Sequence, residues 1–144
     1  SINVPLIVWD GRLPKNRRGV RHDAMALNID WAPTMLDYAG VDIPERMQGK
    51  SLRPVVEGDA EALRDDAYFE HTFSTDRHPI CVSEGIRTDR WKYIRYPRQE
   101  PVYEELFDLQ KDPVELDNLV NDDKHAATLE RLRTRCDEYR GSLK

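Results

Sequence analysis

Hydrophobic positions follow two different patterns in the two halves of the chain. Residues 4–9 are apolar at almost every position, which is typical of a strand covered on both faces inside a parallel sheet. Segments rich in aromatic and β-branched residues follow at 67–73, 80–88, 91–96 and 105–109, and each predicts a short strand. The pattern therefore indicates one buried strand near the N-terminus and a separate four-stranded antiparallel sheet.

The second and third of these later strands are predicted to form a hairpin around Asp89. Alternation along the third strand places Trp91, Tyr93 and Arg95 on one face and Lys92, Ile94 and Tyr96 on the other. Both faces mix apolar and polar residues, so the pattern leaves open which of them is inward. Cross-strand packing is the favoured role of the aromatic residues, with stacking on sugar rings as the alternative.

A short helix is predicted to begin after Asp30, behind a short strand at residues 23–28. The Asp30 carboxylate is placed to accept a backbone N–H of the first turn. Pro33 falls in that turn, where its missing donor costs little, and Gly40 offers a left-handed stop. The buried face is expected to comprise Met35, Leu36 and Ala39.

A final helix is predicted over residues 125–140, with Leu129, Leu132, Cys136 and Tyr139 at spacings of three and four. We expect this apolar stripe to pack on one face of the sheet. Between the two halves, residues 44–62 are rich in Gly, Pro and charge and read as a long connection. The expected division is therefore into residues 1–60 and 61–144.

Composition narrows the class of protein only a little. The 144 residues carry a formal net charge of -5, which argues against a dedicated nucleic-acid binder. No apolar run approaches the roughly 18 residues of a membrane-spanning helix. Cys81 and Cys136 are too few for a disulfide framework and lack zinc-type spacing, so both are expected to be free, half-buried thiols. The basic residues within 15–22 are expected to form a polar connecting loop, with steering of a sulfated polysaccharide or nucleic acid as the alternative.

Ordered motifs along the chain resemble one enzyme family. They are V-P-L-I-V at 4–8, D-W-A-P-T-M-L-D-Y-A-G-V at 30–41, M-Q-G-K-S-L at 47–52, G-I-R-T-D-R-W-K-Y-I at 85–94, E-L-F-D-L at 105–109 and D-P-V-E at 112–115. Their order and spacing resemble the C-terminal part of type I sulfatases, the formylglycine-dependent sulfuric ester hydrolases of the alkaline-phosphatase-like superfamily. The likeness covers most of the chain.

The resemblance implies a fragment of an α/β, alkaline-phosphatase-like fold. Residues 1–60 would supply the last strand or strands and a helix of the large sheet. Residues 61–144 would form a small α+β subdomain with a four-stranded antiparallel sheet and a C-terminal helix. The implied function is that of the C-terminal portion of a sulfatase, which contributes stability and the rim of the substrate cleft.

The catalytic nucleophile of that family is missing from this sequence. Such sulfatases oxidise a Cys or Ser within Cys/Ser-x-Pro-x-Arg to formylglycine. Here Cys136 has Glu138 where Pro is required, and Ser83 has Gly85 there. We therefore assign no catalytic residue and no metal ligand to this chain, and we predict that it is inactive by itself. Formylglycine and Ca²⁺ are implied only for the complete enzyme.

Three residues are candidates for the rim of the substrate cleft. The small C-terminal sheet borders the cleft in the family, so His71, Arg77 and His78 are the residues predicted to contact an anionic sugar. The alternative is a local hydrogen bond for His71 and a solvated loop for the other two. The acidic pairs at 65–66, 104–105 and 122–123 are interpreted as solvated surface, because adjacent side chains point apart.

The expected partners follow from the same resemblance. They are the missing N-terminal catalytic part and a sulfate ester, with a sugar sulfate the favoured kind and a bacterial source the favoured origin. Nucleic acid and membrane are not expected. An isolated chain should dimerise, exchange strands or leave its first sixty residues disordered.

Two other functions remain open from the sequence. One is a stand-alone, non-catalytic module that binds a sulfated glycan or a protein through Trp91 and Tyr93. The other is the tail of a related phosphonate or phosphate ester hydrolase. The N-terminus leaves periplasmic, extracellular and cytoplasmic locations all open.

Overall fold

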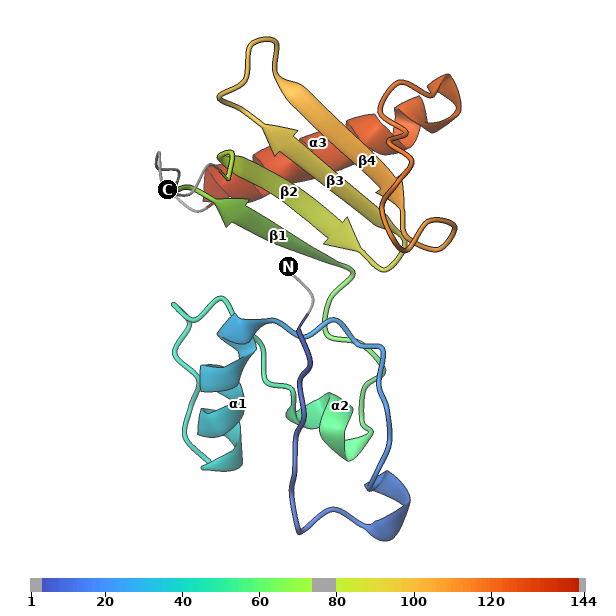
Figure 1. Ribbon diagram of the computed structural model, residues 1–144. Helices are drawn as coiled ribbons and strands as arrows, with labels where there is room; N and C mark the ends of the chain where they lie inside the picture. The colour runs from blue at the N-terminus through green and yellow to red at the C-terminus, as the bar shows by residue number, and fades with distance from the viewer. Residues whose placement is uncertain (1–3, 74–79, 143–144) are drawn as a thin grey trace. The chain divides into compact units, whose positions relative to one another are not determined.

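The computed structural model describes residues 4–73 and 80–142 (Figure 1). The chain separates into two compact units, Ser1–Asp65 and Asp66–Lys144, called here the N-terminal unit and the C-terminal unit. Within the described residues, no helix is both long enough and apolar enough to cross a membrane. The two units differ in their secondary structure.

The N-terminal unit contains short helices and long irregular segments. Its elements are η1 (Lys15–Arg17), η2 (Asn28–Asp30), α1 (Trp31–Tyr38) and α2 (Arg53–Glu57). The strand predicted at 23–28 is wrong, because these residues have no regular structure before η2 begins. Residues 4–9 also form no strand in this structure. A strand needs a hydrogen-bonded neighbour, and the described part of this unit contains no sheet.

Helix α1 begins and ends where the sequence indicates, but it buries a different face. Gly40 has φ of 69°, which confirms the predicted left-handed stop. Pro33 and Thr34 are buried, whereas Met35 is 65% exposed and Ala39 is exposed. The prediction of a buried face is therefore wrong for Met35 and Ala39, whereas Leu36 is partly buried.

The C-terminal unit is a four-stranded antiparallel sheet with a helix on one face, as predicted (Figure 1). Its elements are β1 (Asp66–His71), β2 (Ser83–Thr88), β3 (Trp91–Tyr96), β4 (Tyr103–Asp108), η3 (Asp123–His125) and α3 (Ala126–Ser142). The strands lie side by side in chain order, β1-β2-β3-β4. Short connections make this order natural for successive antiparallel strands.

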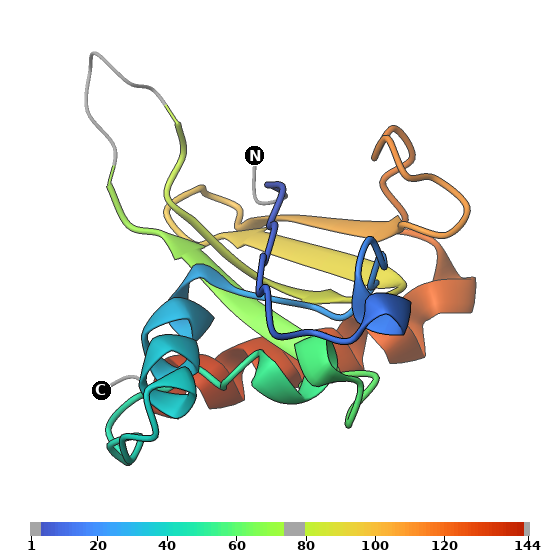
Figure 2. The same cartoon turned by 90° about the horizontal axis from the view of Figure 1, so that it is seen from below.

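Helix α3 crosses one face of the sheet and contacts β2 and β3 (Figure 2). The core between them contains Ile86, Trp91, Tyr93, Leu106, Leu129, Leu132 and Cys136. The Trp91 face of β3 is therefore the inward face that the sequence left open. Because Trp91 and Tyr93 are buried in this core, they offer no ring to a sugar, and the glycan-stacking alternative for these two residues is wrong.

The two cysteines lie in opposite environments. Cys136 is fully buried beneath the sheet, whereas Cys81 is exposed. The prediction of two half-buried thiols is therefore wrong for both, although both are free. The apolar stripe of α3 places Cys136 in the core, and Cys81 lies outside β2.

Candidate functional site

One of the three predicted rim residues, His71, lies within the described part of the chain. His71 is the last residue of β1, opposite Ser83 of β2, and its side chain is partly exposed. Arg77 and His78 lie outside the described residues. His71 therefore stands at the β1–β2 end of the sheet as the one rim candidate whose position the structure gives.

On the helix side of the same sheet, a buried carboxylate holds β1, β2 and β3 to α3. Glu84 accepts a hydrogen bond from the Tyr68 hydroxyl at 3.0 Å and from Arg95 Nε at 2.9 Å. Arg95 also pairs with Asp137 of α3 at 2.7 Å. Burial and the Glu84 carboxylate raise the pKa of Tyr68. Because the Glu84 carboxylate accepts hydrogen bonds from these donors, it joins the sheet to α3 and has a structural role.

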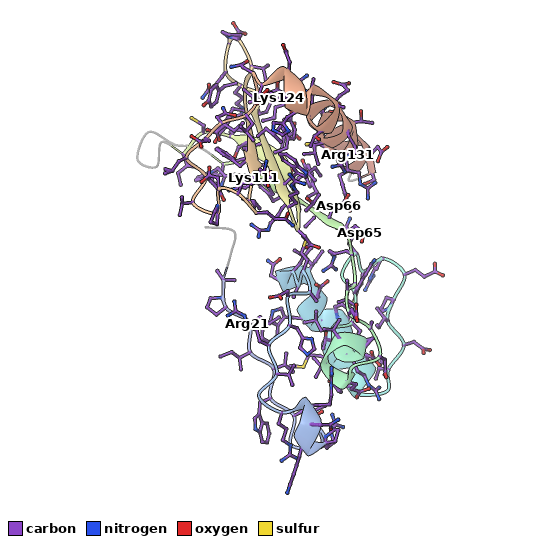
Figure 3. All side chains as sticks on the ribbon, turned by 90° about the vertical axis from the view of Figure 1, so that its right-hand side faces the viewer. Arg21, Asp65, Asp66, Lys111, Lys124 and Arg131 are labelled. Atoms are coloured by element: carbon purple, nitrogen blue, oxygen red, sulfur yellow. The ribbon has the colours of Figure 1, made fainter. Side chains whose placement is uncertain are left out.

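One residue from each of two acidic pairs predicted as solvated surface is bonded to α3 instead. Asp66 accepts from Arg135 Nε at 2.6 Å and from the Tyr139 hydroxyl at 2.7 Å, and Arg131 lies on the same helix (Figure 3). Burial raises the pKa of Asp66, but these hydrogen bonds outweigh it and lower the pKa overall. The solvated-surface interpretation is therefore wrong for Asp66.

Glu104 shows the same behaviour at the other edge of the sheet. It pairs with Arg133 of α3 and accepts the Tyr93 hydroxyl at 2.5 Å. Burial raises the pKa of Glu104, but the Arg133 and Tyr93 hydrogen bonds lower it overall. Within residues 4–73 and 80–142, no three His, Cys, Asp or Glu side chains gather where they could hold a metal ion. Asp66 and Glu104 are therefore ion-pair partners of α3.

In the N-terminal unit, Asp30 is the centre of a polar clasp. Its buried carboxylate accepts from the backbone N–H of Leu27 at 2.7 Å and of Lys50 at 2.9 Å. Arg64 adds two bonds of 2.6 Å. Burial raises the pKa of Asp30, but Arg64 and these backbone donors lower it overall. Asp30 is the N-cap residue of α1, as predicted, but its carboxylate makes no hydrogen bond to the first turn, because Leu27, Lys50 and Arg64 supply its donors.

The clasp also explains why two of the sequence motifs occur together. Thr34 Oγ1 accepts the backbone N–H of Leu52 at 2.9 Å, which ties 30–41 to 47–52. A methyl group on Gly49 would collide with the Ile29 carbonyl, so only glycine lets these segments approach. The role of both motifs in this chain is therefore structural.

The basic loop of the N-terminal unit is held by its own arginines. Arg17 donates to the Val55 carbonyl at 3.0 Å. Arg18 donates to the carbonyls of Leu13 and Gly11 at 2.7 and 2.9 Å. These bonds occupy guanidinium groups that would otherwise face a polyanion, and they favour the interpretation as a connecting loop.

Residues 4–9 form the most unusual surface of the N-terminal unit. Ile7 is 85% exposed and Trp9 is 87% exposed. No backbone hydrogen bond joins residues 4–9 to another described residue. Within this segment, residues 6–9 line an open apolar groove of about 300 Å³ together with Trp31, Met35 and other residues of α1. Sequence reasoning found this segment from its unbroken apolar run, but it did not find the groove.

Comparison with known proteins places these features in one family. The sequence model of the family described as "N-sulphoglucosamine sulphohydrolase, C-terminal" matches residues 1–142. An N-acetylglucosamine-6-O-sulfatase of Bacteroides thetaiotaomicron is 32% identical over 98% of this chain, which corresponds to 25% of that protein. An arylsulfatase of Clostridium perfringens is 33% identical over 92% of this chain and 26% of its own length. The chain thus spans about a quarter of the curated relatives it matches.

Solved structures agree with the sequence matches. One, a protein in complex with its substrate D-glucosamine-2-N,6-O-disulfate, has a TM-score of 0.76 and 31% identity over 83% of this chain and 25% of its own. The phosphonate monoester hydrolase of Agrobacterium radiobacter has a TM-score of 0.62 and 30% identity over 78% of this chain and 24% of its own. The same fold thus occurs in proteins named for different esters.

Proposed function

The chain belongs to the N-sulphoglucosamine sulphohydrolase C-terminal family, and from that premise we propose that it is the C-terminal portion of a sulfatase that hydrolyses sulfated sugars. In this proposal residues 4–9 complete the large sheet of a preceding catalytic part, and the C-terminal unit borders the substrate cleft. The observation that carries the proposal is the exposed, unpaired apolar segment at 4–9.

An apolar segment with a free backbone is costly to leave in water. Each buried large aliphatic side chain stabilises a fold by about 1.5–3 kcal/mol. Unpaired N–H and C=O groups also make such a segment a template for strand addition. The relatives extend beyond this chain by about three quarters of their length, and that preceding part is the proposed source of the neighbouring strands.

In the proposed enzyme, the two parts of the polypeptide have different roles. This sequence has no Cys/Ser-x-Pro-x-Arg, so the formylglycine of the complete enzyme would come from the preceding part. The described residues offer no group fit to hold Ca²⁺, so the cation is assigned to that part as well. This chain would stabilise the complete enzyme and hold His71 at the rim of the substrate cleft. By itself it would not hydrolyse esters.

The substrate class rests on the relatives' names. One relative is named an N-acetylglucosamine-6-O-sulfatase, and one solved structure contains D-glucosamine-2-N,6-O-disulfate as its substrate; both match most of this chain. We therefore assign a sulfated amino sugar as the substrate and a bacterial enzyme as the context. His71, at the end of β1, is the proposed contact to the sugar.

The test uses the full-length protein that carries this chain. Release of sulfate from 6-O-sulfated glucosamine is measured for the wild type, for Ile7→Pro and for Ile7→Ala. Proline removes a backbone donor that a central strand needs, so Ile7→Pro should abolish activity and soluble assembly. Ile7→Ala keeps that donor and should retain part of both. Equal behaviour of the two variants would contradict the strand assignment, and an inactive wild type would contradict the sulfatase assignment.

The contribution of His71 is tested separately. His71→Ala should raise KM for the sulfated sugar about tenfold while kcat changes little, as expected for one lost hydrogen bond of uniform binding. His71→Gln, which keeps a donor, should recover part of the affinity. An unchanged KM in His71→Ala would remove this residue from the rim.

A phosphonate monoester hydrolase is the second candidate function. It is favoured by the structural match to the enzyme of Agrobacterium radiobacter at 30% identity. The same full-length preparation is assayed with a phenyl phosphonate ester and a sulfated sugar at equal concentration. A higher kcat/KM for the phosphonate would replace the sulfatase proposal with this one.

A further inference from the structure

Strand β4 is the last in the order β1-β2-β3-β4 and therefore forms one edge of the sheet. In an antiparallel sheet, the backbone groups of alternate residues point away from the neighbouring strand. On β4 these residues are Glu104, Leu106 and Asp108, whose backbone groups form hydrogen bonds outside the sheet. An edge strand with such groups free is a template for pairing with another chain.

Residues 118–120, called here the strap, bond to the outer side of β4, where the chain turns back along the sheet before α3 (Figure 1). Asn118 Oδ1 accepts the Leu106 N–H at 3.0 Å, and Asn118 Nδ2 donates to the Glu104 carbonyl at 3.1 Å. The Leu119 N–H adds a bond of 2.8 Å to the Leu106 carbonyl. The strap therefore bonds to β4 as a fifth strand would, with the side-chain amide of Asn118 in place of a backbone peptide group.

The strap is held in place by its other two residues. Leu119 and Val120 are partly buried and pack against the core of the C-terminal unit. Asn118 is exposed, and its Oδ1 also accepts the Val120 N–H at 3.1 Å. Because Asn118 fills no space in the core, its side chain acts on β4 and on the strap through hydrogen bonds.

We propose that the strap keeps β4 from pairing with β4 of a second copy of the protein, and that Asn118 holds this edge closed. A second copy carries the same outward backbone groups, and two identical strands joined about a two-fold axis would satisfy both edges at once. With six residues, β4 has the usual length of a paired strand. The inference is independent of the proposed activity, because it assigns no part of this edge to substrate.

The experiment compares three substitutions in the full-length protein that carries this chain. Asn118→Leu removes the amide at similar side-chain size. Asn118→Lys also removes it but adds a charge beside the edge, which opposes strand pairing. Asn121→Leu is the control, because it makes the same chemical change as Asn118→Leu at an exposed position in the same loop.

Two quantities are measured for each variant. Hydrogen exchange of the Leu106 amide reports whether the edge is open, and light scattering after size-exclusion chromatography gives the molecular mass. Both Asn118 variants should exchange this amide about tenfold faster than the wild type, because its acceptor is lost. Asn118→Leu alone should double the mass measured for the wild type.

The proposal fails on any of three results. Unchanged exchange in both Asn118 variants would show that Asn118 does not hold the edge closed, and Asn118→Lys gives this result even where Asn118→Leu is insoluble. Faster exchange in Asn118→Leu without a change of mass would show that the open edge does not accept a second copy. An equal doubling of mass in Asn121→Leu would assign the association to added apolar surface.

Discussion

The two units of this chain contain similar apolar side chains but bury them very differently. In the C-terminal unit, the large apolar residues of the strands meet those of α3, and Tyr93, Leu106 and Leu132 are fully buried. In the N-terminal unit, Ile7 and Trp9 remain in water. An apolar run therefore predicts that a segment is destined for a core, but it does not say that the core is encoded in the same stretch of chain.

The N-terminal unit is accordingly stabilised by hydrogen bonds and ion pairs. The Asp30 clasp joins backbone donors and Arg64 at one buried carboxylate, whereas the C-terminal unit surrounds an apolar core with ion pairs to α3. We therefore expect the N-terminal unit to unfold when a buried charged side chain is removed. The C-terminal unit should instead be destabilised most by substitutions that reduce the volume of its buried apolar side chains. The difference between the two units can be tested by substitution, by pH and by thiol labelling.

The largest effect is expected from Asp30→Ala. Breaking a buried ion pair by removing one partner leaves an uncompensated charge and costs about 3–5 kcal/mol, which should unfold the N-terminal unit. Hydrogen exchange of the Leu52 amide, bonded to Thr34 in the intact unit, measures the loss. Asp10→Ala, which removes the surface pair with Arg12, serves as the control and should leave that amide protected. Protection of Leu52 in Asp30→Ala would contradict the role of the clasp.

The next effect is expected from Leu132→Ala in the core of the C-terminal unit. Leu132 is fully buried, and such a truncation costs about 2–5 kcal/mol through lost burial and the cavity that remains. Urea unfolding followed by far-ultraviolet circular dichroism measures it. Leu116→Ala, at a residue that is 80% exposed, should stay within about 0.5 kcal/mol of wild type. Similar losses for the two variants would show that the core is not where the structure places it.

A smaller effect is expected from pH, and it should act through the carboxylates paired to α3. The folded-state pKa values of Asp66 and Glu104 are lowered overall, because their hydrogen bonds to Arg135, Tyr139 and Arg133 outweigh burial. Their stabilisation is therefore present above the unfolded pKa values of about 4 and is lost as pH falls through the folded values.

Free energies of unfolding of the C-terminal unit, measured between pH 7 and pH 2, test this sign. The wild type should lose stability on acidification. Asp66→Asn should be less stable at pH 7 and should lose less of its stability as pH falls. Parallel pH curves for wild type and variant would show that Asp66 does not contribute in this way.

The smallest effect is a difference in thiol reactivity that leaves stability unchanged. Burial raises the pKa of Cys136 to about 11, and its thiol is inside the core, whereas Cys81 is exposed. A thiol reagent at pH 8 should therefore label one cysteine rapidly, and mass spectrometry should find the label on Cys81. Cys136 should react only in urea or in Leu132→Ala. Rapid labelling of both cysteines in the native chain would contradict the closed core.

Much of the C-terminal unit could be predicted from the sequence, because the local periodicity of apolar residues determines where its strands and its helix lie along the chain. Strand β3 begins at Trp91 and ends at Tyr96, as the alternation indicates, and α3 buries the stripe that contains Leu129 and Leu132. The inward face of β3 could not be chosen from β3 alone, because it depends on where α3 lies.

Predictions failed where contacts come from far along the chain. The Asp30 carboxylate is taken by donors from Lys50 and Arg64, which no window around the helix start could indicate. Met35 is 65% exposed, although the helical pattern placed it on the buried face. The position of His71 at the end of β1 could be predicted, but its contact with substrate depends on chain segments outside the described residues and stays a prediction.

The unpaired segment at residues 4–9 also has a consequence for the order of events during synthesis. A ribosome makes the polypeptide from its N-terminus, so in the proposed whole protein the catalytic part would leave the exit tunnel before this strand. Until residues 4–9 emerge, the sheet of that part would lack one strand. Translation that stops early would release a part that contains the catalytic chemistry but lacks a strand, and such a product would be a target for chaperones and proteases. In the proposed whole protein, the catalytic part would thus complete its fold only after residues 4–9 have been synthesised and have joined its sheet.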